Sequence, residues 1–215
     1  MEIKVVRQIM EWNEDCHKEL QEEFNKKKIL VINIMGSPGG GKTTFITRLM
    51  ESLKEEYKLG VVEADLAGQI DAEKIQAMGI PVVQLNTEGA CHIEAMAIKN
   101  ILPYFDLDNL DILFIENIGN LVCPAEFEIG EDLKLALLSV PEGDDKVEKY
   151  PLMFSKSNAL VITKYDMKEY FKFDEERVIK NAQKLNGAIE IFKVNSSKGE
   201  GFTDILQYIK NHLKR

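Results

Sequence analysis

The chain has 215 residues, of which 45% are hydrophobic and 29% charged, an ordinary composition for one large α/β domain. Its net charge of −9 argues against non-specific binding of nucleic acid, because the phosphate backbone would repel it. The sequence has no N-terminal apolar stretch typical of a signal peptide, and its longest apolar run, 29–35, contains an asparagine and is too short to span a bilayer. We therefore expect a cytoplasmic protein with no membrane partner.

The first predicted element is an amphipathic helix over residues 2–26. Its apolar residues recur at three- and four-residue steps, and its other face is densely charged. These apolar residues are Val5, Ile9, Trp12, Cys16, Leu20 and Phe24. We treat residues 1–27 as an N-terminal helix that packs on a domain over 28–215 or on a partner subunit. Within it, the neighbouring Cys16 and His17 point about 100° apart and are poor joint metal ligands.

From residue 28 onward, short β-branched runs alternate with helical patterns. The runs predict buried strands at 29–35, 59–64, 81–86, 111–116, 134–140, 158–163 and 189–194. Helices are predicted near 42–56, 71–78, 91–102, 174–185 and 202–213. This order predicts an α/β fold with a mainly parallel, twisted sheet of about seven strands and helices on both faces. Ligands of such sheets bind outside the carboxyl ends of the strands.

Residues 36–44, immediately after the first of these strands, read GSPGGGKTT and match the phosphate-binding pattern G-x-x-x-x-G-K-[ST]. The glycines let several backbone N–H groups point at one anion, and the following helix adds the positive end of its dipole. Lys42 can reach the β- and γ-phosphates, and the Thr43 hydroxyl can hold Mg²⁺. We therefore predict a nucleoside-triphosphate site formed by Gly36, Ser37, Gly39, Gly40, Gly41, Lys42, Thr43 and Thr44.

Such a site also needs acidic groups for the metal and for the attacking water. Asp65 and Asp71 follow the second strand, and Glu116 stands at the end of the strand at 111–116. We assign catalytic roles to Asp65, Asp71 and Glu116 together with Lys42, and expect Asp71 and Glu116 to join Thr43 around Mg²⁺. Either Asp65 or Asp71 can position the water, and Asp71 can instead be a helix N-cap. Gly119 suits a loop that moves when a γ-phosphate is present.

The strand at 158–163 ends in Thr163-Lys164-Tyr165-Asp166, close to the N-K-x-D pattern of P-loop GTPases. Asp166 can accept two hydrogen bonds from guanine that adenine cannot donate, and the stem of Lys164 can pack along the base. Thr163 replaces the usual asparagine, so we expect guanine preference with a weaker affinity. Ser197 and Lys198, in the stretch NSSKGEG at 195–201, form a weaker candidate contact with the base.

The stretch NTEGACHIEA at 86–95 contains a cysteine and a histidine side by side. Cys91 and His92 can be core residues or metal ligands, and the residues alone leave both interpretations open. Cys and His suit Zn²⁺ and Ni²⁺, and Cys123 lies on the loop after Glu116 that is expected to sense the γ-phosphate. Because one chain supplies three such groups, a closed site is most easily built from two chains.

Taken together, the segments GSPGGGKTT, NTEGACH, ENIGNLVCPAEFEIGE, EGDDKVEKYPLMF and TKYD resemble those of HypB, the family of nickel-incorporation GTPases of [NiFe]-hydrogenase maturation. This family belongs to the dimerising branch of P-loop GTPases that includes UreG. The resemblance implies a slow GTPase that forms a homodimer with GTP bound and holds Ni²⁺ or Zn²⁺ at the dimer interface through Cys91, His92 and Cys123. It also implies a nickel-delivery partner protein and the hydrogenase large subunit as partners. The chain lacks the N-terminal C-x-x-C-G-C motif and the His-rich tract of some bacterial members.

The resulting hypothesis is that GTP and Mg²⁺ order the segment 65–71 and the loop after Glu116, close the dimer and bring two sets of metal ligands together, while hydrolysis releases the metal. One alternative is a nickel GTPase that serves urease or another metalloenzyme, although UreG-type chains carry Cys-Pro-His where Cys91 and His92 are adjacent here. Another is a metal-binding dimerisation module with a structural nucleotide.

Overall fold

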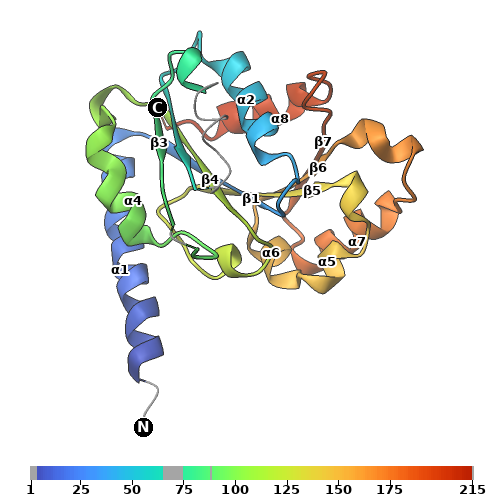
Figure 1. Cartoon of the computed structure of the whole chain (residues 1–215), viewed down its shortest axis with the longest axis horizontal. Helices are drawn as coiled ribbons and strands as arrows, with labels where there is room; N and C mark the ends of the chain where they lie inside the picture. The colour runs from blue at the N-terminus through green and yellow to red at the C-terminus, as the bar shows by residue number, and fades with distance from the viewer. Residues whose placement is uncertain (1–3, 65–74, 88, 215) are drawn as a thin grey trace.

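A parallel sheet lies at the centre of the structure, a computed structural model that describes residues 4–64, 75–87 and 89–214 (Figure 1). Its seven described strands lie side by side in the order β3-β2-β4-β1-β5-β6-β7, and neighbouring strands pair in parallel. The strands are β1 (Leu30–Gly36), β2 (Leu59–Glu63), β3 (Val82–Gln84), β4 (Ile112–Gly119), β5 (Leu133–Ser139), β6 (Ala159–Thr163) and β7 (Glu190–Lys193). Each lies within a few residues of its predicted range, and the predicted fold class is confirmed.

Helices cover both faces of the sheet (Figure 1). Helices α2 (Lys42–Leu53) and α8 (Phe202–Asn211) pack on one face, where Leu30, Ile32 and Ile34 of β1 point. The other face packs against α1 (Lys4–Lys27), α4 (Ala95–Ile101), α5 (Lys146–Lys149), α6 (Pro151–Lys156) and α7 (Glu175–Leu185). Short 3₁₀ turns are found at Leu102–Tyr104, Leu107–Asn109, Cys123–Ala125, Val140–Glu142 and Tyr165–Glu169. Burial on both faces explains why the strands are continuously apolar.

Three helices, α4, α5 and α6, differ from the sequence analysis. The helix predicted near 91–102 begins only at Ala95, because Glu94 has an extended backbone with φ −98° and ψ 155°. Cys91 and His92 therefore lie in a non-helical turn before α4. Helices α5 and α6 were not predicted; both are short, and Pro151 opens the second of them. Of the helix predicted near 71–78, the described residues 75–77 are helical.

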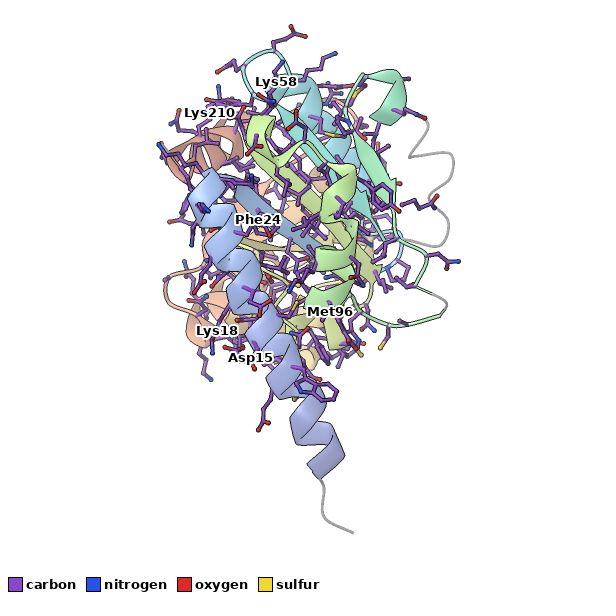
Figure 2. The ribbon with its side chains drawn as sticks, turned by 90° about the vertical axis from the view of Figure 1, so that its left-hand side faces the viewer. Asp15, Lys18, Phe24, Lys58, Met96 and Lys210 are labelled. Carbon is purple, nitrogen blue, oxygen red and sulfur yellow. The ribbon has the colours of Figure 1, made fainter. Side chains whose placement is uncertain are left out.

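The N-terminal helix α1 lies beside α4 and extends past the sheet at its N-terminal end (Figures 1 and 2). Cys16, Leu20 and Phe24 are buried in the core shared with α4 and the sheet, whereas Trp12 is 67% exposed. The C-terminal part of α1 thus packs on its own chain, while the division of the chain at residue 27 stays a prediction. In the part of the chain that the structure describes, no helix is long and apolar enough to cross a membrane.

Candidate nucleotide and metal sites

The phosphate-binding loop connects the carboxyl end of β1 to the first turn of α2. Gly39 and Gly41 have φ of 73° and 90°, a left-handed conformation that is strained for any residue with a side chain. Gly41 is also the N-cap of α2 and offers no side chain to the first N–H groups of the helix. The sequence analysis expects these N–H groups to bind phosphate, and the lack of a side-chain cap at Gly41 is compatible with that prediction.

Lys42 and Thr43 open α2 next to the acidic end of β4. The ammonium of Lys42, which is 4% exposed, donates to the carbonyl oxygens of Ser37 at 3.2 Å and Gly36 at 3.5 Å. The Thr43 hydroxyl donates to Oε1 of Glu116 at 2.9 Å. The structure thus brings together the predicted lysine, threonine and glutamate, whereas Asp65 and Asp71 lie outside the described residues.

A second buried carboxylate, missed by the sequence analysis, stands beside Glu116. Glu63 ends β2 opposite Glu116 in the register of β2 and β4, and the two are 1% and 2% exposed. The sequence signal that could have identified Glu63 is its position as an acidic residue at the end of a predicted strand. The carboxyl ends of two adjacent strands therefore present two acidic side chains near the phosphate loop.

The predicted base-recognition segment is tied directly to the phosphate loop. The Thr163 hydroxyl donates to the carbonyl oxygen of Gly40 at 2.7 Å, and Lys164 Nζ donates to that of Gly39 at 2.8 Å. Thr163, which stands in place of the asparagine of the N-K-x-D pattern, therefore connects the two loops. Asp166 is exposed in the following 3₁₀ turn, as recognition of a base from solution requires.

The loop at 195–201 lies against α2. Asn195 Oδ1 accepts hydrogen bonds from the hydroxyl of Ser197 at 2.7 Å and from the backbone N–H of Lys198 at 3.3 Å. Ser197 and Lys198 are both exposed. Arg48 of α2 donates to the carbonyl oxygens of Ser196 and Ser197, each at 3.2 Å. The sequence analysis did not identify Arg48, because its partner lies almost 150 residues away along the chain.

Cys91, His92 and Cys123 form a compact group of potential metal ligands. One ligand atom from each of the three lies within 4.8 Å of the others. Cys91 Sγ lies 3.5 Å from His92 Nδ1, and Cys123 opens the 3₁₀ turn Cys123–Ala125. The imidazole stacks on the ring of Phe127, with the ring centroids 3.8 Å apart and an interplanar angle of 19°. Thiol and imidazole are ligands that suit Ni²⁺ and Zn²⁺.

The protonation of these groups depends on their surroundings. Burial lowers the pKa of His92, and Glu94 and Glu126 oppose this effect. The shift favours the neutral imidazole, which is the form that binds metals. A hydrogen bond with Cys91, together with burial, raises the pKa of the Cys123 thiol. A metal that binds here must therefore displace a thiol proton.

Asn120 connects the phosphate loop to the potential metal ligands. Its backbone N–H donates to the carbonyl oxygen of Gly36 at 3.1 Å, and its side-chain Nδ2 donates to that of Cys91 at 3.3 Å. Its Oδ1 accepts from the N–H of Val122 at 2.8 Å, which orders the loop that leads to Cys123. The preceding Gly119 is so close to the loop that a Cβ atom there would lie 2.8 Å from Cγ of Pro38. The two sites therefore share one loop, and the sequence analysis did not identify Asn120.

The chain is similar in sequence and in structure to known proteins. Residues 30–193 match the family model CobW/HypB/UreG, nucleotide-binding domain. Hydrogenase maturation factor HypB of Escherichia coli is 39% identical over 208 residues, which cover 97% of this chain and 72% of that protein. Hydrogenase/urease maturation factor HypB of Helicobacter hepaticus is 38% identical, with 97% and 87% covered. The crystal structure of HypB from Helicobacter pylori in complex with nickel has a TM-score of 0.86 and 36% identity, and covers 94% of this chain and 97% of that one.

Proposed function

The chain belongs to the CobW/HypB/UreG family, and on this premise we propose that it is a GTP-hydrolysing metallochaperone that delivers nickel during [NiFe]-hydrogenase maturation. The observation that carries the proposal is the pair of hydrogen bonds from Asn120 to Gly36 and to Cys91, because they connect the phosphate loop to the metal ligands. Any change in the position of the phosphate loop is thereby passed to the backbone of Cys91.

In this proposal, the phosphate loop and α2 bind the triphosphate. The N–H groups of the loop hold the phosphate oxygens, and the ammonium of Lys42 exchanges its carbonyl partners for the β- and γ-phosphates, where it offsets the charge that develops during hydrolysis. Asp166 reads the guanine edge, and Ser197 and Lys198 border the base. Asp65 or Asp71 orients the attacking water.

Thr43 at the start of α2 and Glu116 in β4 fit a magnesium ion. The Thr43 hydroxyl and the Glu116 carboxylate are hard oxygen ligands, and their 2.9 Å hydrogen bond already brings them together at the phosphate loop. Thr43 and Glu116 would hold the ion, with Asp71 as a further ligand. When bound, Mg²⁺ neutralises phosphate charge.

Nickel is the cargo, held by Cys91, His92 and Cys123. Because three protein ligands leave the coordination sphere open, we propose that a homodimer completes it with the same groups from a second chain. Zn²⁺ can occupy the same ligands. A nickel-delivery protein would load the site, and the hydrogenase large subunit would receive the metal.

The test is a linkage measurement. Nickel affinity is measured with GDP and with a non-hydrolysable GTP analogue bound, and the affinity for each nucleotide is measured with and without nickel. If the two sites are coupled, both comparisons give the same factor. Equal nickel affinities in the two nucleotide states would overturn the proposal. The double variant Cys91→Ser/Cys123→Ser is the control, which should lose nickel binding and retain GTP binding.

The alternatives make different predictions. A module with a structural nucleotide would neither hydrolyse nor exchange GTP, so a steady-state turnover assay excludes or supports it. Urease is the second client to test, since the Helicobacter hepaticus relative is named for both hydrogenase and urease. We favour hydrogenase alone because the Escherichia coli relative is named for hydrogenase only and because the Cys-Pro-His motif of UreG is absent here.

A further inference from the structure

Asn13, on the buried side of α1, holds together two chain segments that are distant in sequence. Its side-chain Oδ1 accepts from the backbone N–H of Ala95 at 2.8 Å, and its Nδ2 donates to the carbonyl oxygen of Glu128 at 2.8 Å. The residue is 9% exposed, so these bonds are largely shielded from water. Both ends of one planar amide group are therefore occupied by partners of fixed position.

The two partners of Asn13 lie a few residues after the proposed metal ligands in the sequence. Ala95 opens α4 three residues after His92, and the N-cap residue Glu94 makes no side-chain cap bond, so Asn13 caps α4 from another helix. Glu128 follows Phe127, the residue whose ring stacks on His92, in the segment that begins at Cys123. One asparagine thus joins the segment that carries Cys91 and His92 to the segment that carries Cys123.

One turn further along α1, His17 strengthens this attachment. Its Nδ1 accepts from the backbone N–H of Gly130 at 2.9 Å, and its Nε2 lies 3.3 Å from Oε2 of Glu128. The other carboxylate oxygen of Glu128 lies 3.2 Å from Nζ of Lys134, whose side chain is 8% exposed. The polar groups on the inner face of α1 therefore bind the stretch after Cys123 at several points. The neighbouring Cys16 is instead buried in the apolar core.

We infer that α1 is a positioning element of the metal site, and that Asn13 sets the spacing between the Cys91–His92 pair and Cys123. The inference rests on the proposed assignment of these three residues as ligands. Asn13 touches no ligand atom directly; it acts through the backbone on either side of the site. Metal affinity depends strongly on ligand spacing, and loss of a group that orients a ligand typically lowers it about 10- to 100-fold.

Two substitutions at Asn13 separate its two bonds. Asn13→Ala removes both, whereas Asn13→Asp keeps an acceptor for the Ala95 N–H and loses the donor to Glu128. Asn25→Ala is the matched control, because Asn25 is an exposed asparagine on the same helix. The readouts are nickel affinity by competition with a chelator, the nickel–thiolate absorption band, hydrogen exchange at the Ala95 amide, and GDP affinity.

We expect Asn13→Ala to weaken nickel binding about tenfold, to alter the thiolate band and to speed exchange at Ala95, with GDP affinity unchanged. Asn13→Asp should keep Ala95 protected and weaken nickel binding by a smaller factor. Asn25→Ala should match the unmodified protein in every readout.

The possible failures can be told apart. If Cys91→Ser/Cys123→Ser loses nickel while both Asn13 variants bind it normally, the inference about α1 is wrong and the proposed function stands. If the double cysteine variant still binds nickel stoichiometrically, the proposed metal site itself is wrong. A loss of nickel and GDP affinity in equal measure in both Asn13 variants would show that Asn13 only stabilises the fold, which also overturns the inference.

Discussion

At the scale of single residues, the base-recognition segment shows how one side chain can replace another. Thr163 is shorter than asparagine, yet its hydroxyl reaches the carbonyl oxygen of Gly40 at 2.7 Å, because β6 ends close to the phosphate loop. Lys164, at φ 51°, turns the chain so that Asp166 emerges into solvent. Under the proposed function, guanine recognition therefore depends mainly on the carboxylate of Asp166.

Replacement of Asp166 tests this assignment. Asp166→Asn should move the preference from GTP toward xanthosine triphosphate, because an amide offers a donor where guanine requires two acceptors. The amide oxygen can still accept one neutral hydrogen bond, but the second bond and the charge assistance are lost, so GTP affinity should fall roughly 100-fold, measured by competition with a fluorescent nucleotide. Thr163→Ser, which keeps the hydroxyl, is the control. Unchanged GTP affinity in Asp166→Asn would refute the base assignment.

Tyr165, in the same segment, belongs to a hydrogen-bonded cluster around the carboxylate of Glu175. Glu175 accepts hydrogen bonds from the Tyr165 hydroxyl at 2.6 Å, from Lys193 at 2.6 Å and from Lys168. Burial by itself would raise the pKa of Glu175, but the hydrogen bonds from Lys168, Lys193 and Tyr165 lower it from 4.5 to about 2. The carboxylate therefore stabilises the fold fully above pH 4.5, and this contribution is lost as the pH falls toward about 2.

The corresponding prediction concerns thermal stability. Glu175→Gln should lower the Tm near neutral pH, and its difference from the unmodified protein should shrink as the pH falls below 4.5. Thermal unfolding followed by circular dichroism across this range measures the difference. Glu176→Gln, at the exposed neighbouring position, is the matched control and should leave the Tm near neutral pH almost unchanged. A pH-independent difference between Glu175→Gln and the unmodified protein would mean that the cluster does not depend on the carboxylate charge.

At the scale of elements, the sequence predicted what local pattern controls and missed what distant contacts control. The strands and the phosphate loop follow from continuous apolar runs and from glycine spacing, and both were predicted. The start of α4 at Ala95 was not predicted, because the residue that caps this helix is Asn13, which lies 82 residues earlier in the chain. Asn120 was missed for the same reason, since its side-chain partner Cys91 lies 29 residues away.

The contact between the end of β4 and the phosphate loop yields a prediction at this scale. A Cβ atom at Gly119 would lie 2.8 Å from Cγ and 2.9 Å from the backbone nitrogen of Pro38, so the loop must shift to accept it. We expect Gly119→Ala to lower nucleotide affinity about tenfold, since overpacking typically costs ~1–3 kcal/mol. Binding of a fluorescent GDP derivative measures the loss.

Gly187→Ala is the matched control, because the nearest atom to a Cβ there is 3.9 Å away in an exposed turn. It should bind nucleotide normally. If Gly119→Ala also binds normally, the phosphate loop and the end of β4 move more freely than their close contact implies.

At the scale of the whole molecule, charge opposes the proposed dimer. Each chain has a net charge of −9, so two chains repel one another at low ionic strength. We expect a doubled mass with nickel and a non-hydrolysable GTP analogue, and a monomer with GDP. Raising the ionic strength from ~0.01 M to ~0.15 M should strengthen association, because the Debye length falls from about 30 Å to about 8 Å.

Light scattering at several protein concentrations measures both effects. Cys91→Ser should dimerise less with nickel and the GTP analogue than the unmodified chain does. A mass that is the same with GDP and with the GTP analogue, at either ionic strength, would exclude nucleotide-controlled dimerisation.

The backbone bond from Asn120 to Gly36 has a consequence for the evolution and engineering of such chains. Under the proposed function, one short loop serves both sites, so a substitution that adapts it to a different cargo ion should also alter the rate of the nucleotide cycle. Substitutions in this loop would then change the metal selectivity and the rate of the nucleotide cycle together. Under the proposed function, a designer who wishes to change the cargo alone should begin at Phe127, which stacks on His92 and takes no part in that bond.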